Sequence, residues 1–300
     1  MDNKFNFSSK FRVANIFSLI LFVTSVLFIF FKGLNYGIDF KGGTLIELRA
    51  SSTGASEIRT ALNKMDLGDV NVKNFGQEGD YLIKVEQKEN DGNKIIPQIK
   101  ENLSENLKTE INFRRVENVG PKVSSELLQS GIIAISLSLA AMLFYIWIRF
   151  EWQFSIGSII ALFHDVVITL GIFSVLSLEI NLSIIAAVLT IVGYSMNDTV
   201  VIYDRIRENL NKFNRLNIKE IADLSINDTL ARTIITSVTT LLALLSIFIL
   251  GGEILKGFSF AMILGVVIGT YSSIFVASPM LKFFKVTYKT LEKEDEKIVP

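Results

Sequence analysis

Long apolar stretches dominate the pattern of hydrophobic and polar positions along the chain. Four of them contain no Asp, Glu, Lys, Arg or His, a fifth contains only His164 and Asp165, and a sixth contains only Asp198. About 20 apolar residues are enough for a helix to cross the hydrocarbon core of a bilayer. The pattern therefore predicts six transmembrane helices, at about 13–32, 127–148, 154–178, 180–204, 233–251 and 257–281.

The polar segment between the first two of these helices, residues 33–126, has the pattern of a separate domain. Alternating apolar residues predict strands, and apolar residues at every third or fourth position predict helices. Pro97 is expected in the first turn of its helix, where a missing amide hydrogen is tolerated. Strands and helices are expected in the order β-α-β-β-α-β, at 44–50, 55–65, 70–75, 81–87, 93–108 and 111–119. This order predicts an α+β domain of the ferredoxin-like type.

The positive charges are distributed unevenly about the predicted helices. Fifteen Lys and Arg residues lie in regions that the helices place on one side, namely the tails 1–12 and 282–300, the loop after the second helix and a loop at 205–232. The short loops on the other side contribute only Lys256. Cytoplasmic loops are the ones enriched in Lys and Arg. We therefore expect both termini in the cytoplasm and an extracytoplasmic domain at 33–126.

Composition supports a membrane protein and excludes several other classes. Hydrophobic residues make up 50% of the chain and its mean hydropathy is +0.43, which is too apolar for an ordinary soluble domain. The absence of cysteine excludes disulfides and thiolate metal sites, and we expect neither a metal nor a cofactor. The net charge is zero and no basic domain stands out, so nucleic-acid binding has no support. The first helix lacks a small-x-small cleavage site and is expected to stay as an anchor in the lipid bilayer.

Asp198 is the main candidate for a functional residue, because a charged side chain near a helix centre costs about 2.5–3.5 kcal/mol on insertion scales. Arg232, at the start of the fifth predicted helix, lies in the same half of the membrane and could hold the carboxylate ionised. A proton that competes with the arginine would make a relay, whereas an Asp that only hydrogen-bonds to neighbouring helices would be structural. The relay is the favoured interpretation. Polar residues expected to support it are Tyr194, Ser195, Asn197, Thr199 and Thr236.

A second carboxylate, Asp165, lies closer to the middle of the membrane. It follows His164, the only histidine of the chain. Neighbouring residues on a helix point about 100° apart, so the two side chains do not pair automatically. A proton relay and an interhelical hydrogen bond both remain open for Asp165, and the hydrogen bond is favoured.

Three further motifs carry small or polar residues. Asp204 and Arg205 lie in either an interfacial helix or a solvated charged loop, of which the loop is favoured. Asp39, in the stretch NYGIDFKGG, fixes a turn, meets the outer end of another helix, or lies in a plain membrane-exit loop. The sixth predicted helix has a small residue at every fourth position, which favours close helix packing through Gly257, Ala261, Gly265, Gly269 and Ser273.

An enzymatic function has little support. Tyr203 and Asp204 match half of the signature of an intramembrane aspartyl protease, but no Asp follows in the fifth or sixth predicted helix. Two carboxylates in a membrane do not by themselves make a catalytic dyad. We therefore expect a transport protein without catalytic residues, with a passive assembly scaffold as the alternative.

Five motifs in a fixed order resemble the SecF branch of the SecD/SecF protein-export family. They cover essentially the whole chain, and the fourth-helix motif is the most specific. They are GIDFKGG at 37–43, ALFHDVVITLG at 161–171, VGYSMNDTVVIYDRIREN at 192–209, TLARTIITSVTT at 229–240 and GFSFAMILGVVIGTYSSIFVASP at 257–279.

The resemblance implies half of a resistance-nodulation-division transporter, with SecD supplying the other six helices. Such a complex works with the SecYEG channel and associated Sec components in the bacterial cytoplasmic membrane, where the proton-motive force helps to move preproteins outward. Na⁺ is the alternative coupling ion. In the family, the positions of Asp198 and Arg232 belong to the proton pathway, which a SecD carboxylate completes. Further positions that match the family pattern are Asp39, Tyr194, Asn197, Thr199, Asp204 and Arg205.

A multidrug or lipid exporter of the same superfamily is the main alternative within this resemblance. Those transporters normally carry both halves, with two outer domains, in one chain. A chain of 300 residues with one such domain argues against them.

Overall fold

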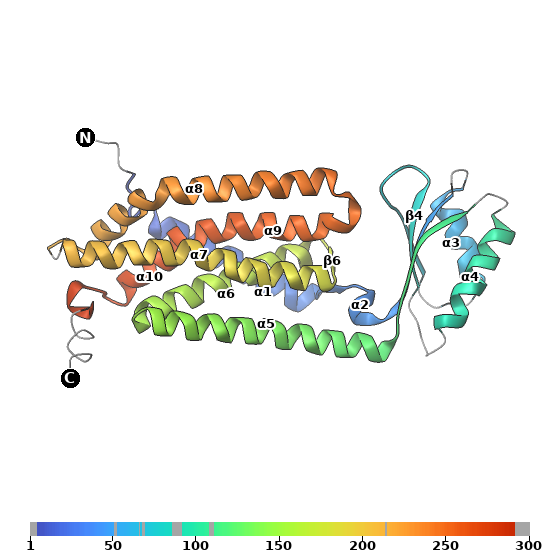
Figure 1. Ribbon diagram of the computed structural model, residues 1–300, viewed down its shortest axis with the longest axis horizontal. Coiled ribbons are helices and arrows are strands. Elements are labelled where there is room, and N and C mark those ends of the chain that lie inside the picture. Colours follow the sequence, from blue (N-terminus) through green and yellow to red (C-terminus); the bar gives the residue numbers. More distant parts are fainter. Residues whose placement is uncertain are drawn as a thin grey trace.

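The computed structural model describes residues 5–50, 53–65, 67, 70–85, 92–107, 111–213 and 215–291. These residues form a helical bundle with a sheet domain at one end (Figure 1). The sheet domain is inserted after the first helix of the bundle, and the chain returns to the bundle after it. The last helix, α10 (Ser278–Phe283), lies at the end of the bundle away from the sheet domain.

Six helices in the described part of the chain are long and apolar enough to cross a membrane, which confirms the predicted number. The bundle consists of α1 Phe11–Lys32, α5 Pro121–Arg149, α6 Trp152–Val175, α7 Leu182–Lys212, α8 Ile218–Leu250 and α9 Gly252–Ser272, which a π-helical turn, η1 Ser273–Ala277, connects to α10. At least half of the apolar window is buried in α6, α7 and α9, and less than a fifth in α1, α5 and α8. Helices α6, α7 and α9 therefore form the inside of the bundle, and the other three present apolar side chains to lipid.

α7 and α8 extend beyond the predicted transmembrane segments, so the loop predicted at 205–232 is wrong for most of its length. α7 continues to Lys212 and α8 begins at Ile218. Ile206 and Ile221, on the two extensions, are both buried in one hydrophobic cluster. Apolar residues at helical spacing therefore continue both helices through a segment whose charges indicated a loop.

The sheet domain has the predicted ferredoxin-like organisation. Its elements are β2 Gly43–Arg49, α3 Ala55–Asn63, β3 Val70–Asn74, β4 Asp80–Val85, α4 Gly92–Asn106 and β5 Asn112–Val119. The strands pair antiparallel in the order β3-β4-β2-β5. Both helices cover one face of the sheet (Figure 1), where alternate strand residues such as Ile46 and Ile83 are fully buried with Leu62 and Leu103 of the helices. Every second strand residue therefore faces the helices, as the alternation of side chains along a strand requires.

Two boundaries of this domain differ from the prediction. α4 begins at Gly92, so Pro97 lies in its second turn rather than its first, and one carbonyl near the start of the helix lacks its usual amide donor. α5 begins at Pro121, earlier than the domain boundary predicted at 126. Proline is favoured as the first residue of a helix, because its missing N–H would have no partner there.

A short parallel ladder connects the sheet domain to the bundle. β1 (Asn35–Tyr36) follows α1, and it pairs with β6 (Glu179–Ile180), which joins α6 to α7. The helical turn α2 (Ile38–Lys41) leads from β1 into the sheet domain. Lys84 of β4 forms an ion pair with Glu179 of β6. The connection between α6 and α7 is therefore attached to the sheet domain through backbone and side chain.

Candidate functional site

Asp198 lies on α7 inside the bundle, with 4% of its surface exposed. Its carboxylate Oδ2 accepts a hydrogen bond from Thr270 Oγ1 of α9 at 3.3 Å. Thr270 Oγ1 also lies 2.8 Å from Ser237 Oγ of α8. Because Thr270 has one hydroxyl hydrogen and donates it to Asp198, Ser237 must donate to Thr270. Asp198 is therefore the acceptor at the end of a chain of two hydroxyl groups that crosses three helices.

Arg232 forms no ion pair or hydrogen bond with Asp198, its predicted partner, but it lies close enough to act on that carboxylate electrostatically. The two residues lie at a similar depth in the bundle. α7 and α8 are antiparallel, and Asp198 is as far along the chain from the end of α7 as Arg232 is from the start of α8. Arg232 is exposed, and it forms no ion pair or side-chain hydrogen bond with the described part of the chain. Thr236, one turn further on, donates its hydroxyl to backbone carbonyls of its own helix. The guanidinium group therefore lies on the surface of the bundle, next to the candidate site but outside it.

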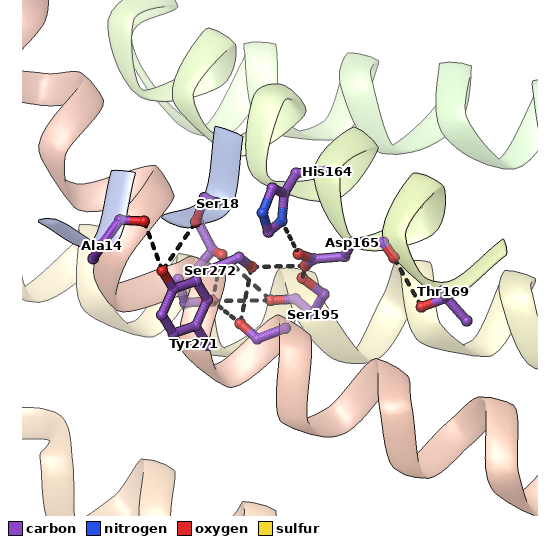
Figure 2. Close-up of polar contacts among 11 residues, drawn as sticks. Ala14, Ser18, His164, Asp165, Thr169, Ser195, Tyr271 and Ser272 are labelled. Atoms are coloured by element: carbon purple, nitrogen blue, oxygen red, sulfur yellow. Dashed lines mark hydrogen bonds and ion pairs between the residues drawn. The ribbon is translucent and has the colours of Figure 1, made fainter. Parts of the chain in front are cut away.

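Asp165 of α6 is completely buried and forms the centre of a second polar cluster (Figure 2). Its Oδ2 accepts hydrogen bonds from Ser195 Oγ of α7 at 2.5 Å and from Ser272 Oγ of α9 at 2.7 Å. His164 Nδ1 lies 2.8 Å from Oδ1. The structure therefore assigns Ser195, which the sequence places one turn before Asp198, to Asp165 instead.

The other polar residues of α7 near Asp198 have separate environments. Thr199 Oγ1 lies 2.7 Å from Ser273 Oγ, at the start of η1. The hydroxyl of Tyr194 is buried and has no hydrogen-bond partner among the described residues. Asn197 is exposed. The predicted polar stripe is therefore divided, because successive residues on a helix point about 100° apart, so Asn197, Asp198 and Thr199 face three different directions.

Asp204 and Arg205 lie further along α7, at the end of the bundle. Asp204 Oδ1 is 2.8 Å from Arg149 Nη2 of α5. Arg205 forms ion pairs with Asp228 of α8 at 2.8 Å and with Glu208 of its own helix at 2.6 Å. These partly exposed ion pairs connect helix ends and do not reach the carboxylate of Asp198.

The small residues of α9 face α7. A Cβ atom added at Gly265 would lie 2.2 Å from Ile191 Cγ1, and one added at Gly269 would lie 2.9 Å from Ser195 Cβ. Gly257 lies opposite Ile184, and Ala261 is completely buried. The stripe therefore packs within the chain and allows α9 to approach α7 closely enough for Thr270 to reach Asp198.

Sequence reasoning missed three hydroxyl groups that complete the two clusters, those of Ser237, Thr270 and Ser272. All three lie in segments identified only as transmembrane or as closely packed. A polar residue beside the small-residue stripe could have identified two of them, since Thr270 and Ser272 follow Gly269 closely in the sequence. In the described part of the chain, no group of three His, Asp or Glu side chains could hold a metal ion.

Asp39 lies at the N-terminal end of α7, where its Oδ2 accepts a hydrogen bond from the backbone N–H of Leu182 at 2.9 Å. A carboxylate at a helix N-terminus satisfies a free amide and interacts favourably with the helix dipole. Asp39 belongs to α2, on the linker to the sheet domain. It therefore connects that linker to the helix that carries Asp198.

Two family descriptions match the chain. Residues 99–287 match "Protein export membrane protein SecD/SecF, C-terminal", and residues 27–53 match "SecD/SecF GG Motif". The chain is 46% identical over 282 residues to "Protein translocase subunit SecF" of Rickettsia bellii, which covers 93% of both chains. It is 44% identical over 275 residues to a protein of the same description from Vibrio alginolyticus, covering 90% of this chain and 86% of the other.

Two crystal structures of SecDF have a similar fold. One, described as a translocon-associated membrane protein from Thermus thermophilus, superposes with a TM-score of 0.84 at 36% identity and covers 95% of this chain. The other, a super-membrane-facing form of SecDF, gives a TM-score of 0.71 at 35% identity and covers 99% of this chain. The chain spans only 39% and 40% of the lengths of these two SecDF chains.

Proposed function

This chain belongs to the SecD/SecF family of protein-export membrane proteins, and from that premise we propose that it acts with SecD to couple the proton-motive force to preprotein export through SecYEG. Asp198 is the group that binds and releases the proton. The observation that carries the proposal is a carboxylate, buried in a transmembrane helix, that accepts a single hydrogen bond from the described residues, the one of 3.3 Å from Thr270.

The hydrogen bonding of Asp198 fits a group that changes its protonation state. A carboxylate that only joins helices collects several short hydrogen bonds, as Asp165 does with its three side-chain partners. Each hydrogen bond donated to the charged form favours that form and so opposes the binding of a proton. Asp198 accepts only one from the described residues, so its neutral form is disfavoured less by hydrogen bonding than that of Asp165.

The exposed position of Arg232 supports a site that a second chain completes. A guanidinium group on the membrane-facing surface of a helix is costly unless it finds a partner or reaches the interface. Arg232 lies at the depth of Asp198 and forms no ion pair among the described residues. We propose that SecD covers this surface and supplies a carboxylate, so that Arg232 lies between that group and Asp198.

The energy available from one proton matches the motion required of such a subunit. One elementary charge that crosses a potential of 100 mV releases about 2.3 kcal/mol. Such an amount biases a two-state domain motion by a factor of about 50. A proton bound at Asp198 can therefore shift the balance between two arrangements of the helices.

α7 provides a path for this shift to the sheet domain. The helix carries Asp198 in its second half, and its first residue, Leu182, is bound by Asp39 of the linker. The strand before it, β6, pairs with β1 and is held to the sheet domain by Glu179. A rotation or translation of α7 would therefore move the attachment points of the sheet domain.

The remaining parts of the proposal concern location and partners. We place the chain in the bacterial cytoplasmic membrane with both termini in the cytoplasm, as the distribution of Lys and Arg predicts. The sheet domain then lies outside, where it meets a preprotein that leaves SecYEG or another Sec component. H⁺ is the coupling ion, and Na⁺ is the alternative that the experiment below distinguishes.

Export of a signal-bearing substrate into inverted vesicles, with and without an imposed proton gradient, tests the proposal. Asp198→Asn and Arg232→Met are expected to abolish the gradient-dependent part of export while SecD still co-purifies. Glu101→Gln, the same kind of change at an exposed carboxylate of α4, should leave export unchanged. Normal export by Asp198→Asn in an intact complex would favour a passive scaffold. Stimulation by a sodium gradient alone would reassign the coupling ion.

A further inference from the structure

Asp165 connects three helices through one carboxylate (Figure 2). It lies on α6, and its Oδ2 accepts from Ser195 on α7 and from Ser272 on α9. All three residues are buried, with at most 2% of their surface exposed. The carboxylate therefore determines how α7 and α9 are rotated relative to each other at this depth.

The helix contacts made by Asp165 flank the contact between Asp198 and Thr270. Ser195 precedes Asp198 by three residues on α7, and Ser272 follows Thr270 by two residues on α9. Since a helix rises about 1.5 Å per residue, each serine lies within about one turn of the residue it would position. If the rotation of either helix changes, Thr270 Oγ1 leaves the hydrogen-bonding range of Asp198.

Close packing makes this position sensitive to small displacements. Gly269 of α9 lies directly against Ser195, where an added Cβ atom would be only 3.2 Å from the Cα atom of Ser195. The hydrogen bond from Thr270 to Asp198 is already 3.3 Å long. This distance is already longer than usual for an O–H···O bond, so a further separation of the helices by a few tenths of an ångström, to about 3.6 Å, would break it.

We propose, on the basis of the function above, that Asp165 is a positioning residue for Asp198 and does not itself carry the proton. Its carboxylate holds Ser195 and Ser272 so that α7 and α9 keep the register in which Thr270 donates to Asp198. The His164 ring fixes the other carboxylate oxygen. The role of Asp165 depends on a hydrogen bond at each of its two terminal side-chain atoms and not on its charge.

Substitution of Asp165 by asparagine separates the hydrogen bonds of this side chain from its charge. The amide oxygen of the new side chain can take the place of Oδ2 and accept from both serine hydroxyls. The amide NH₂ group then faces Nδ1 of His164, which can accept if the imidazole carries its proton on Nε2 instead. His164 Nε2 has no partner among the described residues, so this change of tautomer breaks no hydrogen bond there. Asp165→Asn therefore keeps the contacts and loses the ability to carry a proton.

The test compares Asp165→Asn, Asp165→Ala and the double variant Ser195→Ala with Ser272→Ala, in the complex with SecD. We expect gradient-dependent export to fall by roughly fivefold to tenfold in Asp165→Ala and in the serine double variant, as for the loss of one or two interhelical hydrogen bonds. Asp165→Asn should stay within about twofold of the unmodified protein, since its contacts persist. Unchanged export in the serine double variant, or loss of export in Asp165→Asn, would overturn the inference. If Asp165→Ala does not accumulate in the membrane, the serine double variant still tests the inference.

A spectroscopic measurement reports the position of Thr270 directly. The carbonyl band of protonated Asp198 in infrared difference spectra is identified by its absence from Asp198→Asn. It should shift to higher frequency in Asp165→Ala and in the serine double variant, because the hydrogen bond from Thr270 is lost, and should not shift in Asp165→Asn. An unshifted band in the first two variants contradicts a positioning role. Full export by Asp198→Asn would instead contradict the proposed function, which keeps the two failures distinct.

Discussion

At the scale of single residues, two aspartates in one membrane bundle have different surroundings. Within the described part of the chain, Asp165 has three short hydrogen bonds from side chains, and Asp198 has a single long one. Both are nearly or completely buried, so exposure does not distinguish them. Hydrogen bonds donated to the charged form oppose proton binding more strongly at Asp165 than at Asp198. This difference favours a structural role for Asp165 and a change of protonation state for Asp198.

A third aspartate, Asp80 in the sheet domain, provides a prediction about pH. A hydrogen bond from Arg49, at 2.6 Å, lowers the pKa of this carboxyl, and Arg114 at 3.0 Å acts in the same direction. A lowered pKa stabilises the folded state above the ordinary pKa, and this stability is lost as the pH falls through the lowered value. Asp80→Asn should therefore increase amide hydrogen exchange in β4 and β5 at pH 7, with less effect as the pH falls below about 4.

The comparison is made between the two proteins at equal pH, because exchange chemistry itself depends on pH. Glu105→Gln, on an exposed position of α4, is the control and should match the unmodified protein throughout. An effect of Asp80→Asn that is equally large in acid would show that Arg49 contributes through packing rather than through the charge of Asp80.

At the residue scale, the sequence predicted that Asp198 does not face lipid, and the structure buries it inside the bundle, while its role as a proton carrier stays a prediction. Asp198 stands out because a charge in an apolar helix is costly, wherever it points. Its donor Thr270 does not stand out, because hydroxyl groups are common in transmembrane helices and can bond to their own backbone. The rotation of α9 decides which of them points at Asp198, and that rotation results from packing among α6, α7 and α9.

At the scale of elements, the contact between α7 and α9 is the one that places the site. Glycines at 265 and 269 remove side chains where the helices are closest. Without a hydrophobic driving force between helices in lipid, such close packing and a few hydrogen bonds provide most of the association energy. The small-residue stripe and the hydroxyl groups beside it therefore both hold α9 close to α7.

Gly265→Ala is expected to separate α9 from α7. The new methyl group would lie 2.2 Å from Ile191 Cγ1, and overpacking of this kind typically costs about 1–3 kcal/mol. The nearest atoms all belong to the side chain of Ile191 beyond Cβ, so Gly265→Ala with Ile191→Ala should recover stability and coupled export. Thermal unfolding in detergent and export in vesicles measure the two effects.

Gly193→Ala is the matched control for this prediction. Gly193 lies on α7, where the nearest atom to an added Cβ is Met142 Cε at 4.0 Å. The same chemical change should therefore be neutral or slightly stabilising there. If Gly265→Ala is equally well tolerated, the closeness of α7 and α9 is not required for the site.

Helices and strands were predicted well where the spacing of apolar residues is uninterrupted. They were predicted less well where many charged residues lie between the apolar ones. The strands and helices of the sheet domain follow from alternation and from helical spacing in short segments. The extensions of α7 and α8 carry many charges on one face and buried residues such as Ile206 and Ile221 on the other. Counting charges indicated a loop there, although the apolar face is sufficient to continue both helices.

At the scale of the whole molecule, the described residues hold the sheet domain against the bundle through its linker and one ion pair, and Ser124 of α5 also donates to the Ile38 carbonyl of that linker. β1 pairs with β6 over two residues, Asp39 binds the first residue of α7, and Lys84 pairs with Glu179. Phe75, Leu82 and Leu178 are among the residues that line a cavity of about 720 Å³ between the two parts. We expect contacts of this kind beside an open space to let the domain change its orientation without unfolding.

The ion pair between Lys84 and Glu179 is expected to restrict that motion. Lys84→Glu should broaden the distance distribution between spin labels at Glu57→Cys and Leu250→Cys, which would be the only cysteines of the chain. Partly exposed ion pairs contribute about 0.2–1 kcal/mol, so the shift should be moderate. The charge exchange Lys84→Glu with Glu179→Lys should narrow the distribution again.

Lys64→Glu, at an exposed position after α3, is the control for the change in charge. It should leave the distance distribution unchanged. If the exchanged pair is as broad as Lys84→Glu alone, the orientation of the domain does not depend on this ion pair, and β1 and Asp39 would be sufficient to hold it.

The most direct test of the account is proton entry into proteoliposomes that contain this chain with SecD. A pH-sensitive dye inside the vesicles records acidification after a potential and a preprotein-engaged translocon are supplied. The account predicts entry with the unmodified protein, and none above background with Asp198→Asn in a complex of unchanged composition. Equal rates of acidification with both proteins would contradict a proton-binding role for Asp198.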